Sequence, residues 1–162
     1  MPRPVRRYEK LLLLAKPFLE KNDFGISHTE RVLDIARKQF RIPKETEELI
    51  VVAITLHDIG GRTIKEQYQK GPEIATVLLR QLGYSDPFIE EVCEIIRTHH
   101  DRPNNPTEAF KVVFDADQLA RFSNEEFPIY ESQGTDWNQI IERMYAEKSK
   151  KRAKESLKNK KE

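Results

Sequence analysis

Apolar residues recur at intervals of three and four along most of this 162-residue chain, the spacing that gathers them on one face of an α-helix. No stretch shows the sustained alternation of apolar and polar residues, bounded by hairpin signals, that indicates a β-strand. The pattern therefore predicts an all-α fold, a compact bundle in which several helices bury their apolar faces against one another.

The same pattern predicts three helices before residue 62. The first spans roughly residues 5–20 and ends at the polar stretch 22–25. The second begins at Ser27-His28-Thr29-Glu30, a capping box in which the serine accepts a hydrogen bond from the glutamate amide. The third opens with Pro43 at its first position and stops at Gly60-Gly61.

Four further helices are expected in the rest of the chain. Gly71-Pro72-Glu73 predicts the start of the fourth, which ends at Gly83. Ser85-Asp86-Pro87 predicts the cap of the fifth, which ends before Pro103. A sixth helix follows the cap at residues 105–108 and runs through residue 120. Residues 121–135 are expected to be irregular. A last helix is expected from about residue 136 into the C-terminal end. With no repeat and no linker, we expect one domain over 1–145 and a tail over 146–162.

Composition limits the chemistry of any site. The single cysteine, Cys93, excludes an internal disulfide framework and any cysteine-based zinc finger, which fits a reducing cytosol. Charged residues interrupt the leucine run near the N-terminus, and no apolar run approaches the length of about 18 residues that crosses a bilayer. The sequence thus predicts a cytoplasmic protein without membrane contact, whose metal ligands, if any, are histidine and carboxylate.

The stretch AEKSKKRAKESLKNKKE from Ala146 onward is densely basic, although the net charge of the whole chain is only +1. Such a tail could contact nucleic acid or an acidic partner. We favour a solvated helix end, because the tail lacks the interleaved aromatic residues on which single-strand binders stack bases. The oligomeric state is left open.

Three separate predicted helices place strong metal-ligand types where the pattern expects apolar side chains: His28, the His57-Asp58 pair and Asp117. A carboxylate buried without a partner costs several kcal/mol, so an acid on an apolar stripe needs a cation or hydrogen bonds. Each residue alone has an ordinary interpretation, such as a satisfied buried histidine. Together, and in this order, they predict a site for a divalent cation.

At these residues the chain resembles the HD-domain metal-dependent phosphohydrolases, over about residues 24–125. The matching segments are His28-Thr29-Glu30-Arg31-Val32, Leu56-His57-Asp58-Ile59-Gly60, Ile95-Ile96-Arg97-Thr98-His99-His100 and Phe114-Asp115-Ala116-Asp117-Gln118-Leu119. The resemblance implies that His28, His57, Asp58 and Asp117 hold the metal, with Asp115 as the alternative to Asp117.

The match also has gaps. Many members carry His-Asp-x-Gly-Lys, whereas this chain has Gly61 at the lysine position, which leaves Arg62 and Lys65 as candidate phosphate contacts. Members with several metals tend to carry a histidine at the start of the fourth helix, and this chain has none there. We therefore expect one metal. If a second metal binds, His99 and His100 are its evident ligands.

The resemblance implies cleavage of a phosphate mono- or diester, in a nucleotide or related small molecule, by a metal-activated water. Asp58 and His99 are the expected catalytic residues, and Arg31, Arg62, Lys65 and His100 the expected substrate contacts. Histidine and carboxylate ligands suit Mn, Fe, Co, Ni or Zn. The alternative is a non-catalytic, metal-containing module that binds a nucleotide or regulates, motivated by the missing lysine.

Overall fold

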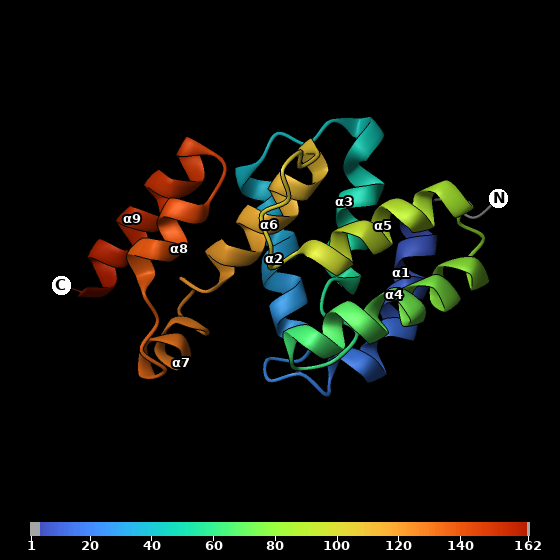
Figure 1. Cartoon of the computed structure of the whole chain (residues 1–162), viewed down its shortest axis with the longest axis horizontal. Coiled ribbons are helices and arrows are strands. Elements are labelled where there is room, and N and C mark those ends of the chain that lie inside the picture. Colours follow the sequence, from blue (N-terminus) through green and yellow to red (C-terminus); the bar gives the residue numbers. More distant parts are fainter. Residues whose placement is uncertain (1–3, 162) are drawn as a thin grey trace.

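The computed structural model describes residues 4–161, and every regular element in that range is a helix (Figure 1). The helices are α1 (Pro4–Leu19), α2 (Ile26–Gln39), α3 (Lys44–Leu56), α4 (Ile64–Gln81), α5 (Asp86–Thr98), α6 (Glu108–Ala120), α7 (Phe127–Ser132), α8 (Trp137–Arg143) and α9 (Glu147–Lys161). The predicted all-α class is confirmed.

The main core gathers side chains from α1 to α6, with α3 at its centre. Every residue of α3 from Leu49 to Leu56 is buried, because α1, α2, α5 and α6 all contact this helix. Burial all round explains why the second half of α3 is apolar at every position but Thr55 rather than an amphipathic stripe. The end of α3 is thereby held in the middle of the bundle, and α2 and α6 lie side by side next to it (Figure 1).

A second apolar cluster joins the end of α6 to α7, α8 and α9. Its centre is Trp137, which stacks on Phe127 with ring centroids 4.4 Å apart and also contacts Phe122. The basic segment takes part, since it forms α9 and Ala153 of that helix is fully buried in this cluster. The domain boundary at residue 145 stays a prediction.

The start of α2 differs from the predicted capping box. The helix begins one residue earlier, at Ile26, after Gly25 with φ +60°, and no side chain caps it. Ser27 then lies inside the first turn, where its hydroxyl donates to the Phe24 carbonyl at 2.7 Å. Because Ser27 lies within the helix rather than at its N-cap, the predicted bond to the Glu30 amide does not form, and the hydroxyl accepts from the Arg31 guanidinium instead.

The start of α4 was predicted seven residues too late. The helix begins at Ile64, where Thr63 accepts a hydrogen bond from the Glu66 amide at 3.1 Å, and it continues through Gly71 and Pro72. A Cβ at position 71 would lie 2.7 Å from a side-chain atom of α5, so this glycine permits close helix packing rather than a break. Packing along α5 compensates the helical hydrogen bond that Pro72 cannot make.

The C-terminal third is more finely divided than predicted. The segment expected to be irregular contains α7, and the single last helix is two helices, α8 and α9. The break follows Met144, which has extended backbone with ψ 151°. Asp115 of α6 accepts hydrogen bonds from the amides of Tyr145 and Ala146, both at 2.9 Å, and so stabilises the start of α9.

Two glycines make the turn between α3 and α4. A Cβ at Gly60 would lie 2.5 Å from the carbonyl oxygen of Glu66, so only glycine lets the turn approach α4 this closely. Gly61 has φ +148°, which side-chain-bearing residues rarely adopt. The turn fixes the two residues that follow α3, His57 and Asp58, against the start of α4.

No helix in the described part of the chain is long and apolar enough to cross a bilayer. The cytoplasmic location stays a prediction.

Candidate metal centre

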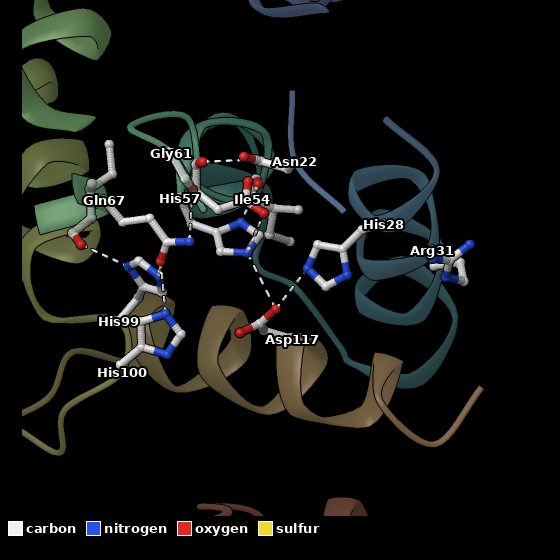
Figure 2. A network of polar contacts seen from close by, with 12 residues as sticks. Asn22, His28, Arg31, Ile54, His57, Gly61, Gln67, His99, His100 and Asp117 are labelled. Carbon is white, nitrogen blue, oxygen red and sulfur yellow. Dashed lines mark hydrogen bonds and ion pairs between the residues drawn. The ribbon is translucent and has the colours of Figure 1, made fainter. Parts of the chain in front are cut away.

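Three helices carry the predicted ligands to one place. His28 lies in the first turn of α2, His57 is the residue that ends α3, Asp58 follows it, and Asp117 lies in α6. Figure 2 shows Asp117 between the imidazoles of His28 and His57, at the junction of the three helices. The structure thus brings together side chains that are up to 89 positions apart in the sequence.

Asp117 is the shared partner of both imidazoles. Its Oδ1 lies 3.0 Å from Nε2 of His28 and 3.2 Å from Nε2 of His57. Asp58 completes the group, with its Oδ2 3.9 Å from Nε2 of His57. Three of the four side chains are buried, and the Asp58 side chain retains 16% of its surface.

The orientation of both imidazoles is set by their other nitrogen. Nδ1 of His57 donates to the Ile54 carbonyl at 2.6 Å, and Nδ1 of His28 contacts the Glu126 carboxylate at 2.8 Å. Each Nε2 consequently faces Asp117. This is the arrangement found around metal-binding histidines, whose second nitrogen is usually held by a carbonyl or carboxylate.

The residues present fit a divalent cation. One ligand atom from each of His28, His57 and Asp58 lies within 4.8 Å of the others. Oδ1 of Asp58 is buried and has no hydrogen-bond partner among the described residues, a costly state for a carboxylate oxygen. The four groups line a cavity of about 80 Å³, which we call the central cavity. Two imidazoles and two carboxylates suit a transition metal.

The surroundings of these side chains favour the charged forms of the two imidazoles and of Asp117. Burial lowers the pKa of His28, but hydrogen bonds to Asp117 and Glu126 outweigh it and raise the pKa to about 10. Burial likewise opposes the charged form of His57, yet Asp58 and Asp117 raise its pKa to about 9. Burial would raise the pKa of Asp117, but the two imidazoles hold it well below the usual value. Without a cation, protons on the imidazoles balance the buried carboxylates.

The opposite wall of the central cavity carries the second histidine pair. Oε1 of Gln67 lies 3.0 Å from Nε2 of His99 and 2.8 Å from Nε2 of His100 (Figure 2). The Gln67 amide donates to the Gly61 carbonyl, which ties this wall to the turn after α3. Burial lowers the pKa of His99 well below 6.5 and also lowers that of His100.

A family model described as an HD domain matches residues 25–121. The chain belongs to the HD-domain family. It is also similar to the crystal structure of a predicted HD superfamily hydrolase from an uncultured Thermotogales bacterium, with a TM-score of 0.65 and 22% identity. That match covers 93% of this chain and 85% of the other, and at this identity it shows the fold. No curated protein matches the chain.

Family and fold together confirm the expected HD-domain bundle. Within this HD-domain chain, the alternative ligand Asp115 lies elsewhere. Its carboxylate is occupied at the start of α9, where both oxygens accept backbone amides. Asp117 is the acid of this pair that contacts His28 and His57.

The predicted substrate contacts lie at different distances from the centre. His100 lines the central cavity. Arg62 lines an adjoining hollow that shares His28 and Asp58 with it, and is paired with Asp23. Arg31 lies on the far side of His28, with its Nε 2.8 Å from Glu126 (Figure 2). The Lys65 side chain is exposed and lines neither space. Substrate contact by these residues stays a prediction.

Sequence reasoning missed two residues that support the ligands. Glu126, fully buried between α6 and α7, holds both His28 and Arg31 through one carboxylate oxygen. Gln67 holds both histidines of the opposite wall. A signal for Gln67 was present, since Thr63-Ile64-Lys65-Glu66 is itself a capping box and would have placed residue 67 on the first turn of α4. Nothing local marks Glu126, whose partners are 95 and 98 positions away.

Proposed function

We propose that this HD-domain protein is a metal-dependent hydrolase that cleaves a phosphate mono- or diester bond in a nucleotide or related small molecule. The observation that carries the proposal is the convergence of His28, His57, Asp58 and Asp117 in one cavity. It includes a buried Asp58 oxygen with no partner among the described residues. The family match to residues 25–121 supports the same conclusion.

The four ligand residues would hold one divalent transition metal. A cation at this position lowers the pKa of a water from about 15.7 toward neutrality and polarises a phosphoryl oxygen. Asp117 and the Nε2 atoms of both imidazoles would turn from each other to the cation, and the protons between them would be released. Asp58, the most exposed of the four, would keep a free oxygen to orient the attacking water and accept its proton.

His99 and His100 would act from the opposite wall. Both are neutral at ordinary pH, because burial lowers their pKa values. We propose that His100 donates from Nε2 to a phosphoryl oxygen. The Nδ1 proton of neutral His99 is held by the Ile96 carbonyl, so its unprotonated Nε2 would relay to the leaving oxygen the proton that Asp58 removes from the water. Each would leave Gln67 for the substrate, since Gln67 occupies Nε2 of both. A second metal at this wall is not required by the proposal.

Turnover with defined metals tests the proposal. Purified protein is stripped with a chelator, reloaded with Mn, Fe, Co, Ni or Zn, and assayed against a generic phosphodiester and a panel of nucleotides. We expect turnover with at least one transition metal and its loss on renewed chelation. Full metal occupancy in a His57→Ala, Asp58→Ala double variant would contradict the site.

The alternative function is a metal-containing module that binds a nucleotide without cleaving it. One observation favours it: the lysine that many family members carry at position 61 has no place here. Gly61 has φ +148°, and a Cβ there would lie 2.9 Å from Cβ of Glu66. Nucleotide binding that requires the metal, with no turnover of any substrate in the panel, would establish this alternative.

A further inference from the structure

A second cavity of about 300 Å³ lies between α6 and α8, and we call it the α6–α8 cavity. His100 and Arg121 line both this cavity and the central cavity. A molecule with a phosphoryl group at the ligand residues can therefore extend into this space, past these two side chains. The α6–α8 cavity is larger than the hollow lined by Arg62, which also adjoins the central cavity and has about 100 Å³. The α8 wall lies beyond residues 25–121, the part of the chain that matches the family.

Two guanidinium groups face the α6–α8 cavity. Arg121 is half-buried and lies against the Tyr130 ring, 4.8 Å from its centroid. Arg143 donates to the His100 carbonyl at 3.0 Å, which holds it at the junction of the two cavities. Neither arginine forms an ion pair with any carboxylate of residues 4–161. The one acid in this wall, Asp136, caps α8 by accepting from the Gln139 amide.

Apolar and amide groups complete the walls. Ile64, at the start of α4, is 52% exposed and packs in neither core cluster, although it lines this cavity. Phe114 lies opposite in the α6 wall, and Gln118 and Gln139 supply amide donors and acceptors. Cavities of this size that combine apolar walls with a few polar groups are the usual form of small-molecule sites.

We propose that the α6–α8 cavity selects the substrate, and that Arg121 and Arg143 are its specificity-determining residues. The preferred substrate carries a second anionic group next to the phosphoryl group that is cleaved, and a ring-sized body that enters between Ile64 and Phe114. Unpaired guanidinium groups bind such anions through charge-assisted, often bidentate, hydrogen bonds. The inference rests on the proposed function for the position of the cleaved group.

The test compares three phosphate esters on the metal-loaded full chain: a nucleoside diphosphate, the matching monophosphate, and methyl diphosphate, which keeps the ester bond and the second anionic group but lacks the ring-sized body. We expect kcat/KM for the nucleoside diphosphate to exceed both others by about ten-fold or more, the effect of one charge-assisted contact. In Arg121→Gln and Arg143→Gln the preference for diphosphate over monophosphate should fall about ten-fold. Arg80→Gln, an exposed arginine of α4, is the matched control and should keep the preference.

Metal content and circular dichroism of each variant separate loss of selectivity from loss of the site or the fold. Gln139→Ala, at an exposed position of α8, is the second variant and should lower the preference even if the arginine variants fold poorly. The inference is overturned if the wild type has the same kcat/KM for the diphosphate and the monophosphate. It is also overturned if every variant keeps the wild-type preference for the diphosphate. If neither these compounds nor any substrate of the metal-reloading assay is turned over, the proposed function fails. Calorimetric binding of diphosphate against monophosphate then decides the role of this cavity by the same ratios.

Discussion

Two pairs of histidines face each other across the central cavity, in similarly enclosed positions. One wall carries His28 and His57, and the other carries His99 and His100. Their neighbours differ. The first pair contacts the carboxylates of Asp117, Asp58 and Glu126, and the second pair contacts the neutral amide of Gln67 and backbone carbonyls. We refer to these as the carboxylate wall and the amide wall.

The difference in partner reverses the effect of burial. Burial alone lowers the pKa of all four imidazoles, as it does for His99 and His100. On the carboxylate wall, hydrogen bonds and charges outweigh burial and raise the pKa values of His28 and His57 to about 10 and about 9. On the carboxylate wall the protons on His28 and His57 balance the carboxylates. A divalent cation bound there would replace these two positive charges with its own. The amide wall is suited to neutral hydrogen bonding instead.

Asp117→Asn should break the carboxylate wall and have the largest effect. It removes the negative charge that both imidazoles share as a partner, with almost no change in shape. We expect metal binding to fall by more than about 100-fold, since even an outer partner of a ligand is worth 10 to 100-fold, and activity to fall with it. The metal-free protein should lose about 3–5 kcal/mol of stability, the usual cost of breaking a buried ion pair. Elemental analysis and urea unfolding measure the two effects.

Asp115→Asn is the matched control, two positions earlier in the same helix. It weakens the two hydrogen bonds at the start of α9, so stability should fall while metal content per folded chain is kept. If Asp115→Asn loses the metal and Asp117→Asn keeps it, the assignment of the ligand in α6 is wrong.

The sequence alone was sufficient to predict that His28, His57, Asp58 and Asp117 meet, because these residues stand on or beside strong helical patterns. Asp117 interrupts the apolar stripe of Phe110 and Val113, and His57 follows the apolar half of its helix. The misfit of residue type is therefore visible in the one-dimensional pattern. The same reasoning predicted α5 and α6 with capping segments at residues 85–87 and 105–108. In the structure Ser85 accepts from the Phe88 amide, and Thr107 accepts from the Phe110 amide.

The parts that could not be predicted depend on contacts between distant segments. Gly71-Pro72 is typical of a helix start, and only the close approach of α5 shows why the helix continues through it. Ser27 and Glu30 form a valid capping pattern, but the turn at Gly25 starts the helix earlier. Glu126 lies in a stretch without periodicity, so its burial against His28 is visible only in three dimensions.

Glu126→Gln should weaken metal binding at the carboxylate wall, because Glu126 is the partner of His28 on the side away from Asp117. The substitution keeps the shape but removes the charge that holds Nδ1 of His28 and pairs with Arg31. We expect metal affinity to fall about 10 to 100-fold, as for other partners of metal-binding histidines, with part of the activity recovered at high metal concentration. Glu125→Gln, the exposed neighbour, should leave the metal affinity as in the wild type. If metal titration gives the same affinity for Glu126→Gln and Glu125→Gln, Glu126 only supports packing.

Gln67→Glu should make the amide wall resemble the carboxylate wall. A carboxylate at this position would lie within hydrogen-bond distance of both His99 and His100, and an opposite charge this close raises a histidine pKa by about 1 to 3 units. NMR titration of the imidazoles measures the shift, and activity near neutral pH should fall by less than about ten-fold. Gln69→Glu, exposed on the same helix, is the control and should shift neither histidine. Unchanged titration in Gln67→Glu would mean that burial, not the partner, sets the state of this wall.

The smallest effect is the pH dependence of stability in the metal-free protein, where the two walls act in opposite windows. His28 and His57 have folded pKa values raised above 6.5, so their contribution is complete below pH 6.5 and is lost as pH rises through about 9 and about 10. His99 and His100 have lowered values, so the folded state loses stability as pH falls below 6.5. The melting temperature should therefore be highest near neutral pH and fall by several degrees on either side.

Metal binding should have the opposite slope on the alkaline side, because the cation must displace the protons of the carboxylate wall and its affinity rises as they dissociate. Thermal melts in chelator and metal titrations over pH 6 to 10 give the two slopes from the same preparation. Asp117→Asn should flatten the alkaline fall. The acidic fall should remain, because burial is the main cause of the lowered pKa values of His99 and His100 and the Asp117 charge only opposes it. An alkaline fall of the same size in Asp117→Asn would assign it to groups other than His28 and His57 and would remove the contrast between the walls.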